Sequence, residues 1–460
     1  MNSTTLSPHA SPERSPSLAD TVERHPLGPS EDILWRASRR FRGDGSGLVT
    51  LRIHGRIQPE LLRGALAVAQ KRHPRLRARI APGPDGKMCF EVHQSFAPIP
   101  LQVKSFDTEE LPWSDEAHQV LEEEFSDGEP MCRLAVLQSE LRPVSELILV
   151  MHHSLTDGIA ALCLLHQILS HYETLWGGTR LEDLLAATEP LPFLASDNPP
   201  LTASWKDRWA MFRRLAKSYA RRRRANWTPI PSDSSAYTPY LTRTQLSVED
   251  THKLLRRCRQ QRVPGYGMLF AAALTSLAET FHGQPVQFAC RSPINMRELP
   301  NCKRVISYEH LGCFAGGLDR VYHFSGRPVE FWSLAREASE DMREFILRQG
   351  PAMMMKLIWV ADALAPLFRV SAERPPMRDT IQVNYIPDLG IKDRYGDLSM
   401  EAFAISGRWR YLGVSLLAFA SVLSGRMNFS LGSVNVARQF REEYHQRFME
   451  KIHRVVQGEI

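Results

Sequence analysis

The chain has 460 residues, more than a single hydrophobic core usually accommodates, so we expect two domains. Hydrophobic residues make up 43% and charged residues 23%, the balance of an ordinary soluble globular protein. The net charge of +6 is spread over a large chain, so composition gives no reason to expect nucleic acid as a partner.

Cysteine usage and hydropathy indicate the cellular compartment in which the protein is expected. The seven cysteines are scattered and never spaced as C-x-x-C, which favours reduced thiols in a cytoplasmic protein over a disulfide framework or a zinc site. No apolar run reaches the roughly 18 residues of a membrane span. Residues 1–30 are rich in Ser and Pro and lack the apolar core of a signal peptide, so we expect a disordered lead-in.

The first half predicts mixed strands and helices. Apolar and polar residues alternate over 48–54, as in a half-buried strand. Pro59 opens a helix that His73-Pro74 ends. Further strands are expected at 76–80, 87–93, 131–138 and 146–151, and an amphipathic helix at 159–176.

Prolines cluster over residues 186–240, as in a crossover between domains. Inside it, 205–224 is helix-like and carries many cations, ending in Arg221, Arg222, Arg223 and Arg224. A solvated linker helix is the ordinary interpretation of such a charge run. Docking of an acidic carrier protein and contact with an anionic membrane are the alternatives.

The second half again mixes strands and helices. Expected strands lie at 240–246, 285–290, 380–384, 413–422 and 426–431, and expected helices at 247–262, 265–281, 328–350 and 438–456. The predicted organisation is therefore a lead-in at 1–30, a first domain at 31–185, a linker at 186–240 and a second domain at 241–460. Alternating strands and helices indicate an α/β fold with mixed sheets.

Chemistry is concentrated at the end of the 146–151 strand, where His152 and His153 are followed by Asp157 and Gly158. Two imidazoles and a carboxylate beside an apolar core are costly unless paired. A neutral histidine is suited to remove a proton from a nucleophile at pH 7. Adjacent histidines on a strand project to opposite sides, which disfavours a shared metal. A purely structural pair is the other interpretation.

His152-His153-Ser154-Leu155-Thr156-Asp157-Gly158 resembles the HHxxxDG signature of the CoA-dependent acyltransferase superfamily, which includes condensation domains and polyketide-associated acyltransferases. His73-Pro74-Arg75-Leu76-Arg77 resembles an H-x-x-L-R segment of these proteins, and residues 293–297 resemble P-[VI]-[DN]-x-R. Residues 311–314 resemble the strand that follows it.

The resemblance implies two chloramphenicol-acetyltransferase-like domains with a tunnel between them. It implies that His153 is the general base, that His152 supports it, and that Asp157 is structural. Arg297 is the expected partner of Asp157 across the domain interface, with Gly158 beside it, and Asn384 is the expected thioester or oxyanion contact. No metal and no cofactor are implied, because an acyl-CoA or phosphopantetheine thioester is a co-substrate.

We therefore expect an O-acyltransferase that moves an acyl group from CoA or an acyl-carrier protein to a hydroxyl of a lipid or polyketide-type natural product. The alternatives are an amide synthase of the condensation type with an amine acceptor, and a catalytically silent binding or scaffold relative. We expect a monomer, with Arg221 to Arg224 contacting the acidic carrier.

Overall fold

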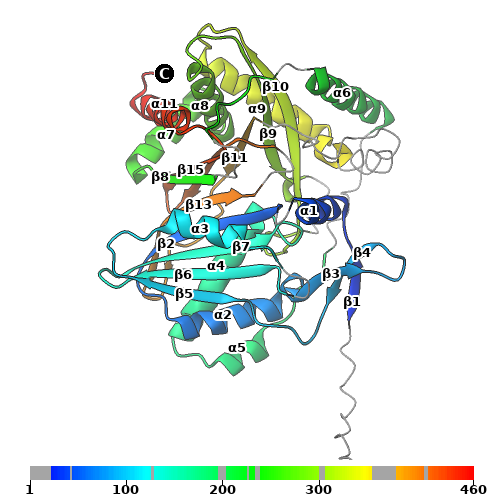
Figure 1. Cartoon of the computed structure of the whole chain (residues 1–460), viewed down its shortest axis with the longest axis vertical. Coiled ribbons are helices and arrows are strands. Elements are labelled where there is room, and N and C mark those ends of the chain that lie inside the picture. Colours follow the sequence, from blue (N-terminus) through cyan, green and yellow to red (C-terminus); the bar gives the residue numbers. More distant parts are fainter. Residues whose placement is uncertain are drawn as a thin grey trace, which may run out of the picture.

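The computed structural model describes residues 22–41, 44–125, 129–194, 204–224, 227–233, 239–299, 306–354, 380–408 and 413–460. Two six-stranded sheets dominate it, each with its own helices, and we call the two units the first and second lobe (Figure 1). A small three-stranded sheet completes the first lobe. No helix in the described ranges is long and apolar enough to cross a membrane.

The sheet of the first lobe has the order β12-β13-β2-β7-β6-β5. Its strands are β2 (Ser46–His54), β5 (Leu101–Phe106), β6 (Cys132–Ser139), β7 (Val144–His152), β12 (Arg394–Tyr395) and β13 (Leu398–Gly407). Helices α2 (Pro59–Arg72) and α4 (Gly158–Trp176) share a core with one face, and α3 (Trp113–Glu122) packs with the other. The strand β7 is consequently buried along its whole length.

The sheet of the second lobe has the order β10-β9-β11-β14-β15-β8. Its strands are β8 (Pro239–Gln245), β9 (Val286–Asn295), β10 (Ala315–Phe324), β11 (Ile381–Ile386), β14 (Leu416–Leu423) and β15 (Arg426–Val434). Helices α7 (Val248–Gln260), α8 (Gly265–Glu279), α9 (Phe331–Leu347) and α11 (Arg438–Gln457) share its core. Helix α6 (Trp205–Arg224) lies outside it, beside β10 and α9 (Figure 1).

The lobes are joined by the strand β13, which follows β11 in the chain but pairs with β2 of the first lobe. Its backbone N–H groups at Phe403 and Ile405 donate to Asn428 Oδ1 and Ser430 Oγ of β15, at 3.3 and 3.2 Å. A buried ion pair adds to this contact, because Arg243 Nη2 of β8 lies 2.7 Å from Glu146 Oε1 of β7. The second half of the chain thus completes the first sheet.

Residues 22–30 correct the expectation of a disordered lead-in over 1–30. The strand β1 (Glu23–Pro26) pairs with β4 (Met88–Val92), which also pairs with β3 (Ala78–Pro82). The helix α1 (Pro29–Arg40) begins within the same segment, and Glu31 caps it by accepting from the Gly28 N–H at 2.7 Å. Pairing with distant strands orders this polar segment, and local composition does not report such pairing. Residues 1–21 lie outside the described ranges.

Most expected elements are present with shifted ends. Ser247 caps α7 by accepting from the Asp250 N–H, and the proline-opened helix α2 begins at Pro59. The basic segment at 205–224 is the helix α6. The helices α3 and α5 (Leu181–Ala187) and the strands β5, β10 and β13 were not predicted from the sequence.

Candidate active site

The two histidines of the motif stand where β7 ends, in a turn that leads to α4. The His153 backbone N–H donates to the Gly45 carbonyl at 2.7 Å, which fixes the turn against the start of β2. His152 is buried, whereas His153 is only partly so. The alternation of a strand end therefore sends His152 into the core and His153 toward the lobe interface.

The His153 ring contacts the second lobe through its Nδ1 atom. This Nδ1 lies 3.5 Å from the Cys313 thiol sulfur. Burial lowers the pKa of His153 below 6.5, while the negative charge of Asp157 and a hydrogen bond with the backbone of His153 itself oppose this shift. A neutral ring with its proton on Nδ1 keeps Nε2 as the proton acceptor.

His152 has a supporting position. Its ring packs edge-on against Trp35, with 5.7 Å between centroids, and against Phe125. Its Nδ1 accepts from the Ser154 backbone N–H at 3.2 Å. Burial lowers the pKa of His152 to about 3, so the ring is neutral and holds the turn in place.

Asp157 ties the two lobes together. Its Oδ1 accepts from the Ala160 N–H at 3.0 Å and so caps α4. Its Oδ2 accepts from Arg297 Nη1 at 2.6 Å and from the Phe314 backbone N–H at 2.9 Å. Both side chains are buried, and Arg297 Nη2 also donates to the His310 carbonyl at 3.0 Å. The ion pair expected between Asp157 and Arg297 is present.

A second buried ion pair, between Arg75 and Glu31, stabilises the turn through contacts with Ser154, and its role was not predicted from the sequence. Arg75 Nη1 lies 2.7 Å from Glu31 Oε1, and both side chains are at most 2% exposed. Arg75 Nη1 also donates to the Ser154 carbonyl at 3.3 Å, while Ser154 Oγ donates to the Glu31 carbonyl at 3.0 Å. Arg75 lies at a variable position of the H-x-x-L-R segment, so that pattern does not indicate its role. Cys313 lies in the 311–314 segment, but nothing in the sequence indicated its contact with His153.

Gly158 and Asn384 lie on facing elements. A side chain at Gly158 would meet Ile386 at 3.8 Å, so the start of α4 faces the end of β11. Asn384 lies two residues before Ile386, and its buried Oδ1 has no hydrogen-bond partner in the described part of the chain. No described hydrogen bond joins it to His153, so its role in substrate binding stays a prediction. Within the described ranges no group of three or more ligand-type side chains is arranged for a metal.

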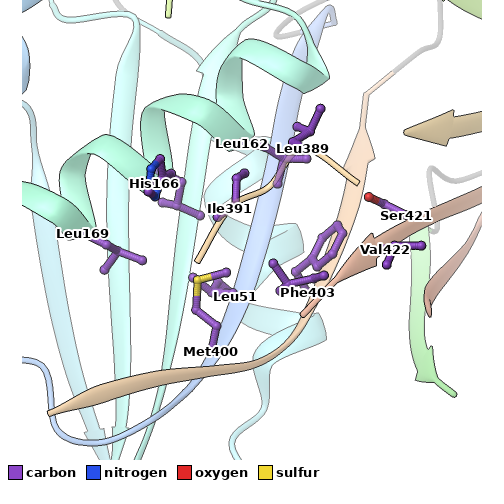
Figure 2. A pocket seen from close by; sticks show the side chains of 12 residues that line it. Leu51, Leu162, His166, Leu169, Leu389, Ile391, Met400, Phe403, Ser421 and Val422 are labelled. Carbon is purple, nitrogen blue, oxygen red and sulfur yellow. The ribbon is translucent and has the colours of Figure 1, made fainter. Parts of the chain in front are cut away.

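An apolar pocket lies along α4, starting one helical turn after Gly158. Figure 2 shows Leu162, His166 and Leu169 of α4 around it, with Met400 and Phe403 of β13. Its cavity volume is about 20 Å³, roughly the space for one water molecule. His166 Nδ1 lies 2.6 Å from the Tyr395 hydroxyl. The lining of the pocket is mainly hydrocarbon.

Comparisons with known proteins gave solved structures only, since no family profile and no curated protein matches the sequence. The first condensation domain of the calcium-dependent antibiotic synthetase, in complex with a substrate analogue, is 14% identical, with a TM-score of 0.67 over 94% of this chain and 96% of that one. The chain has the condensation-domain fold.

Two more structures with this condensation-domain fold cover nearly all of the chain. Polyketide synthase associated protein 5 from Mycobacterium tuberculosis is 15% identical, with a TM-score of 0.61 over 95% of this chain and 98% of that one. A mutant starter condensation domain of rhizomide synthetase, in complex with C8-CoA and Leu-SNAC, is 16% identical, with a TM-score of 0.62 over 94% of each chain. The expected α/β fold with two chloramphenicol-acetyltransferase-like lobes is confirmed; the tunnel between them stays a prediction.

Proposed function

We propose that the chain is an acyltransferase that forms an ester from an acyl thioester and a hydroxyl acceptor. The observation that carries the proposal is the environment of His153 at the lobe interface, where burial lowers its pKa and so favours the neutral imidazole of a general base, and where Nδ1 lies beside the Cys313 thiol. A fold supports many reactions, so the site and not the fold determines the proposed activity.

The proposed reaction needs a single base, His153, which accepts and then returns one proton. The acceptor hydroxyl loses its proton to Nε2 of His153 as its oxygen attacks the thioester carbonyl carbon. The resulting tetrahedral oxyanion collapses, the carbon–sulfur bond breaks, and the imidazolium returns the proton to the leaving thiolate. Asp157 fixes the turn by capping α4 and by pairing with Arg297, while its charge favours the imidazolium.

The donor is a thioester of CoA or of a carrier protein, and two observations support an acyl group. The pocket along α4 is apolar, and a neighbour with this fold is in complex with C8-CoA. Docking of an acidic carrier at Arg221 to Arg224 remains a separate proposal. The side chains of Arg222, Arg223 and Arg224 lie outside the description, and Arg221 lines a hollow between α6 and β10.

An amine acceptor is the second candidate, because condensation domains are among the neighbours with this fold. The same base serves either acceptor, so the acceptor must be identified by its product. For location we propose the cytoplasm, since Cys132, Cys258 and Cys313 are deeply buried free thiols.

A product assay tests the proposal. The purified chain is incubated with a panel of acyl-CoA and acyl-carrier thioesters, each with long-chain alcohols or amines, and products are identified by mass spectrometry. The proposal expects an ester that carries the donor's acyl group. An amide from amines alone would support the second candidate, and no transfer from any donor would support a catalytically silent relative.

A further inference from the structure

Helix α6 is held firmly on the second lobe by one of its faces. Met211 is 1% exposed and packs with Ile294, Leu318 and Phe345. Arg214 forms ion pairs with Glu344 at 3.0 Å and Asp341 at 3.7 Å, both on α9. Ser218 Oγ donates to the Asp319 carbonyl of β10 at 3.4 Å. The orientation of the helix is therefore fixed, and so is the face that it turns to solvent.

The solvent face carries three large aromatic side chains in a row. Trp205, Trp209 and Phe212 are 73%, 54% and 40% exposed. Spacings of four and three residues place them on one stripe of a helix. The rings of Trp209 and Phe212 stack with centroids 5.5 Å apart. Single exposed apolar residues are ordinary, but a contiguous aromatic stripe marks an interaction surface.

Cations lie on both flanks of the aromatic stripe. Helical geometry places Lys206, Arg213 and Lys217 along one flank, where Arg213 and Lys217 also border the hollow between α6 and β10, and Arg208 on the other flank. Lys206, Arg213 and Lys217 form no ion pair with any described residue. Asp207 is the acidic residue of α6. The exposed face is therefore aromatic in its centre and positively charged at its edges.

We propose that α6 docks the protein on an anionic phospholipid surface, with the aromatic stripe at headgroup depth and the flanking cations on lipid phosphates. Tryptophan prefers the membrane–water interface because its ring is apolar with a polar N–H. A helix with cations beside an apolar stripe lies in the plane of that interface. A merely solvated linker helix accounts for the charges and leaves the aromatic stripe unexplained, and an acidic carrier protein accounts mainly for the charges.

Helix α6 packs on a strand that leads to the candidate active site. The hollow between α6 and the second lobe is lined by Leu318 and Val321 of β10. This strand begins at Ala315, directly after Phe314, whose N–H contacts Asp157. At about 3.3 Å per residue, α6 contacts β10 roughly 10–20 Å from that point. Docking itself does not depend on the proposed function.

Co-sedimentation of the full-length chain with vesicles tests the proposal. One vesicle is phosphatidylcholine alone, and the other is phosphatidylcholine mixed with phosphatidylglycerol. The protein is expected to sediment with the anionic vesicle and to be released by high salt. Replacing Lys206, Arg213 and Lys217 by Gln lowers the partition coefficient on the order of 100-fold, because each cation contributes about 1 kcal/mol near such a surface.

A second variant separates the aromatic contribution. Trp205→Ala, Trp209→Ala and Phe212→Ala together are expected to abolish binding at all salt concentrations. The matched control is Leu141→Ala with Lys87→Gln, because Leu141 is 58% exposed and the Lys87 side chain is 80% exposed, both on the first lobe. Circular dichroism verifies that each variant is folded.

Three results would overturn membrane docking. The first is equal binding to both vesicles, and the second is binding that neither α6 variant reduces. The third is that the protein sediments with neither vesicle. In that case an acidic acyl-carrier protein is tested for stronger binding to the wild type than to the α6 variants. That last result would assign the helix to carrier docking.

Discussion

Arg297 and Asp157 form a buried ion pair that joins the two lobes, with 2.6 Å between Arg297 Nη1 and Asp157 Oδ2. The aspartate comes from the turn of the histidine motif, and the arginine follows β9 of the second lobe. The position of His153 at the interface therefore depends on the contact between lobes. This dependence gives the first prediction.

Replacing Arg297 by Ala leaves Asp157 buried without its cation, which costs about 3–5 kcal/mol of unfolding free energy. Arg297→Lys keeps the charge but cannot reproduce both the carboxylate and the His310 carbonyl contacts, so an intermediate loss is expected. Urea unfolding measures both. Arg438→Ala, in the exposed pair with Glu442, is the control and should change little. An Arg297→Ala protein as stable as this control would refute the structural role.

The pH profile follows the pKa of His153, which burial lowers below 6.5. A general base works when neutral, so kcat/KM should be full above this pKa and should fall as the pH drops through it. The acid limb is therefore expected below pH 6.5. Asp157→Asn removes the charge that raises this pKa, so in the fraction that remains folded the limb moves to still lower pH. An acid limb above pH 7 would contradict the assignment of the base.

Cys313 is expected to position His153 through its contact with Nδ1. Losing so weak a partner costs on the order of 1 kcal/mol, so Cys313→Ala should lower kcat about fivefold with KM unchanged. Cys313→Ser should restore the rate, because a hydroxyl retains an acceptor. Steady-state kinetics on the three proteins checks this. If the Ala and Ser variants are equally slow, the sulfur contact has no orienting role.

The free energy of unfolding at acid pH depends on the pKa values of the buried histidines. Burial lowers the pKa of His152 to about 3 and of His73 to about 4, against 6.5 in an unfolded chain. Between pH 6.5 and 4 the unfolded chain binds protons that the folded chain does not, so stability falls as pH decreases. Each group contributes about 1.4 kcal/mol per pH unit. His73→Gln should reduce this slope by that amount in urea titrations, and an unchanged slope would refute the shift.

On the basis of the proposed function, we expect an acyl chain to enter the apolar pocket along α4 as its side chains move apart, because the cavity itself holds only about 20 Å³. Ile391→Trp blocks this opening beside Leu162 and His166. If four methylenes lose their contacts, a long-chain donor loses on the order of 3 kcal/mol, or about 100-fold in kcat/KM. A short-chain donor should be unaffected. Leu141→Trp on the exposed surface is the control, and equal losses for both chain lengths would exclude a chain-binding pocket.

Elements that depend on a local sequence pattern could be predicted from the sequence. The alternation at 48–54 and the proline that opens α2 each reflect the physics of one segment, and the motif placed both histidines at the end of β7. The pairing of Asp157 with Arg297 came from the resemblance, because residues 140 positions apart carry no mutual periodicity.

Features that depend on contacts between distant parts of the chain could not be predicted from the sequence. The strand β13 is recruited to the first sheet by β2, more than 340 residues earlier in the chain, and its own sequence does not indicate this partner. Glu31 and Arg75 are charged residues that composition places on the surface, yet each is buried because the other neutralises it. Cys313 reached His153 only through the packing of the two lobes.

The most direct test of the central claim is the initial rate of thioester consumption by His153→Ala, measured as released CoA thiol or free carrier thiol. Circular dichroism and urea unfolding verify that the variant is folded, and His152→Gln serves as the comparison at the neighbouring position. If Nε2 of His153 is the base, the rate of the His153→Ala protein falls about 100- to 10,000-fold at pH 7. A folded His153→Ala protein that turns over as fast as the wild type would contradict the account.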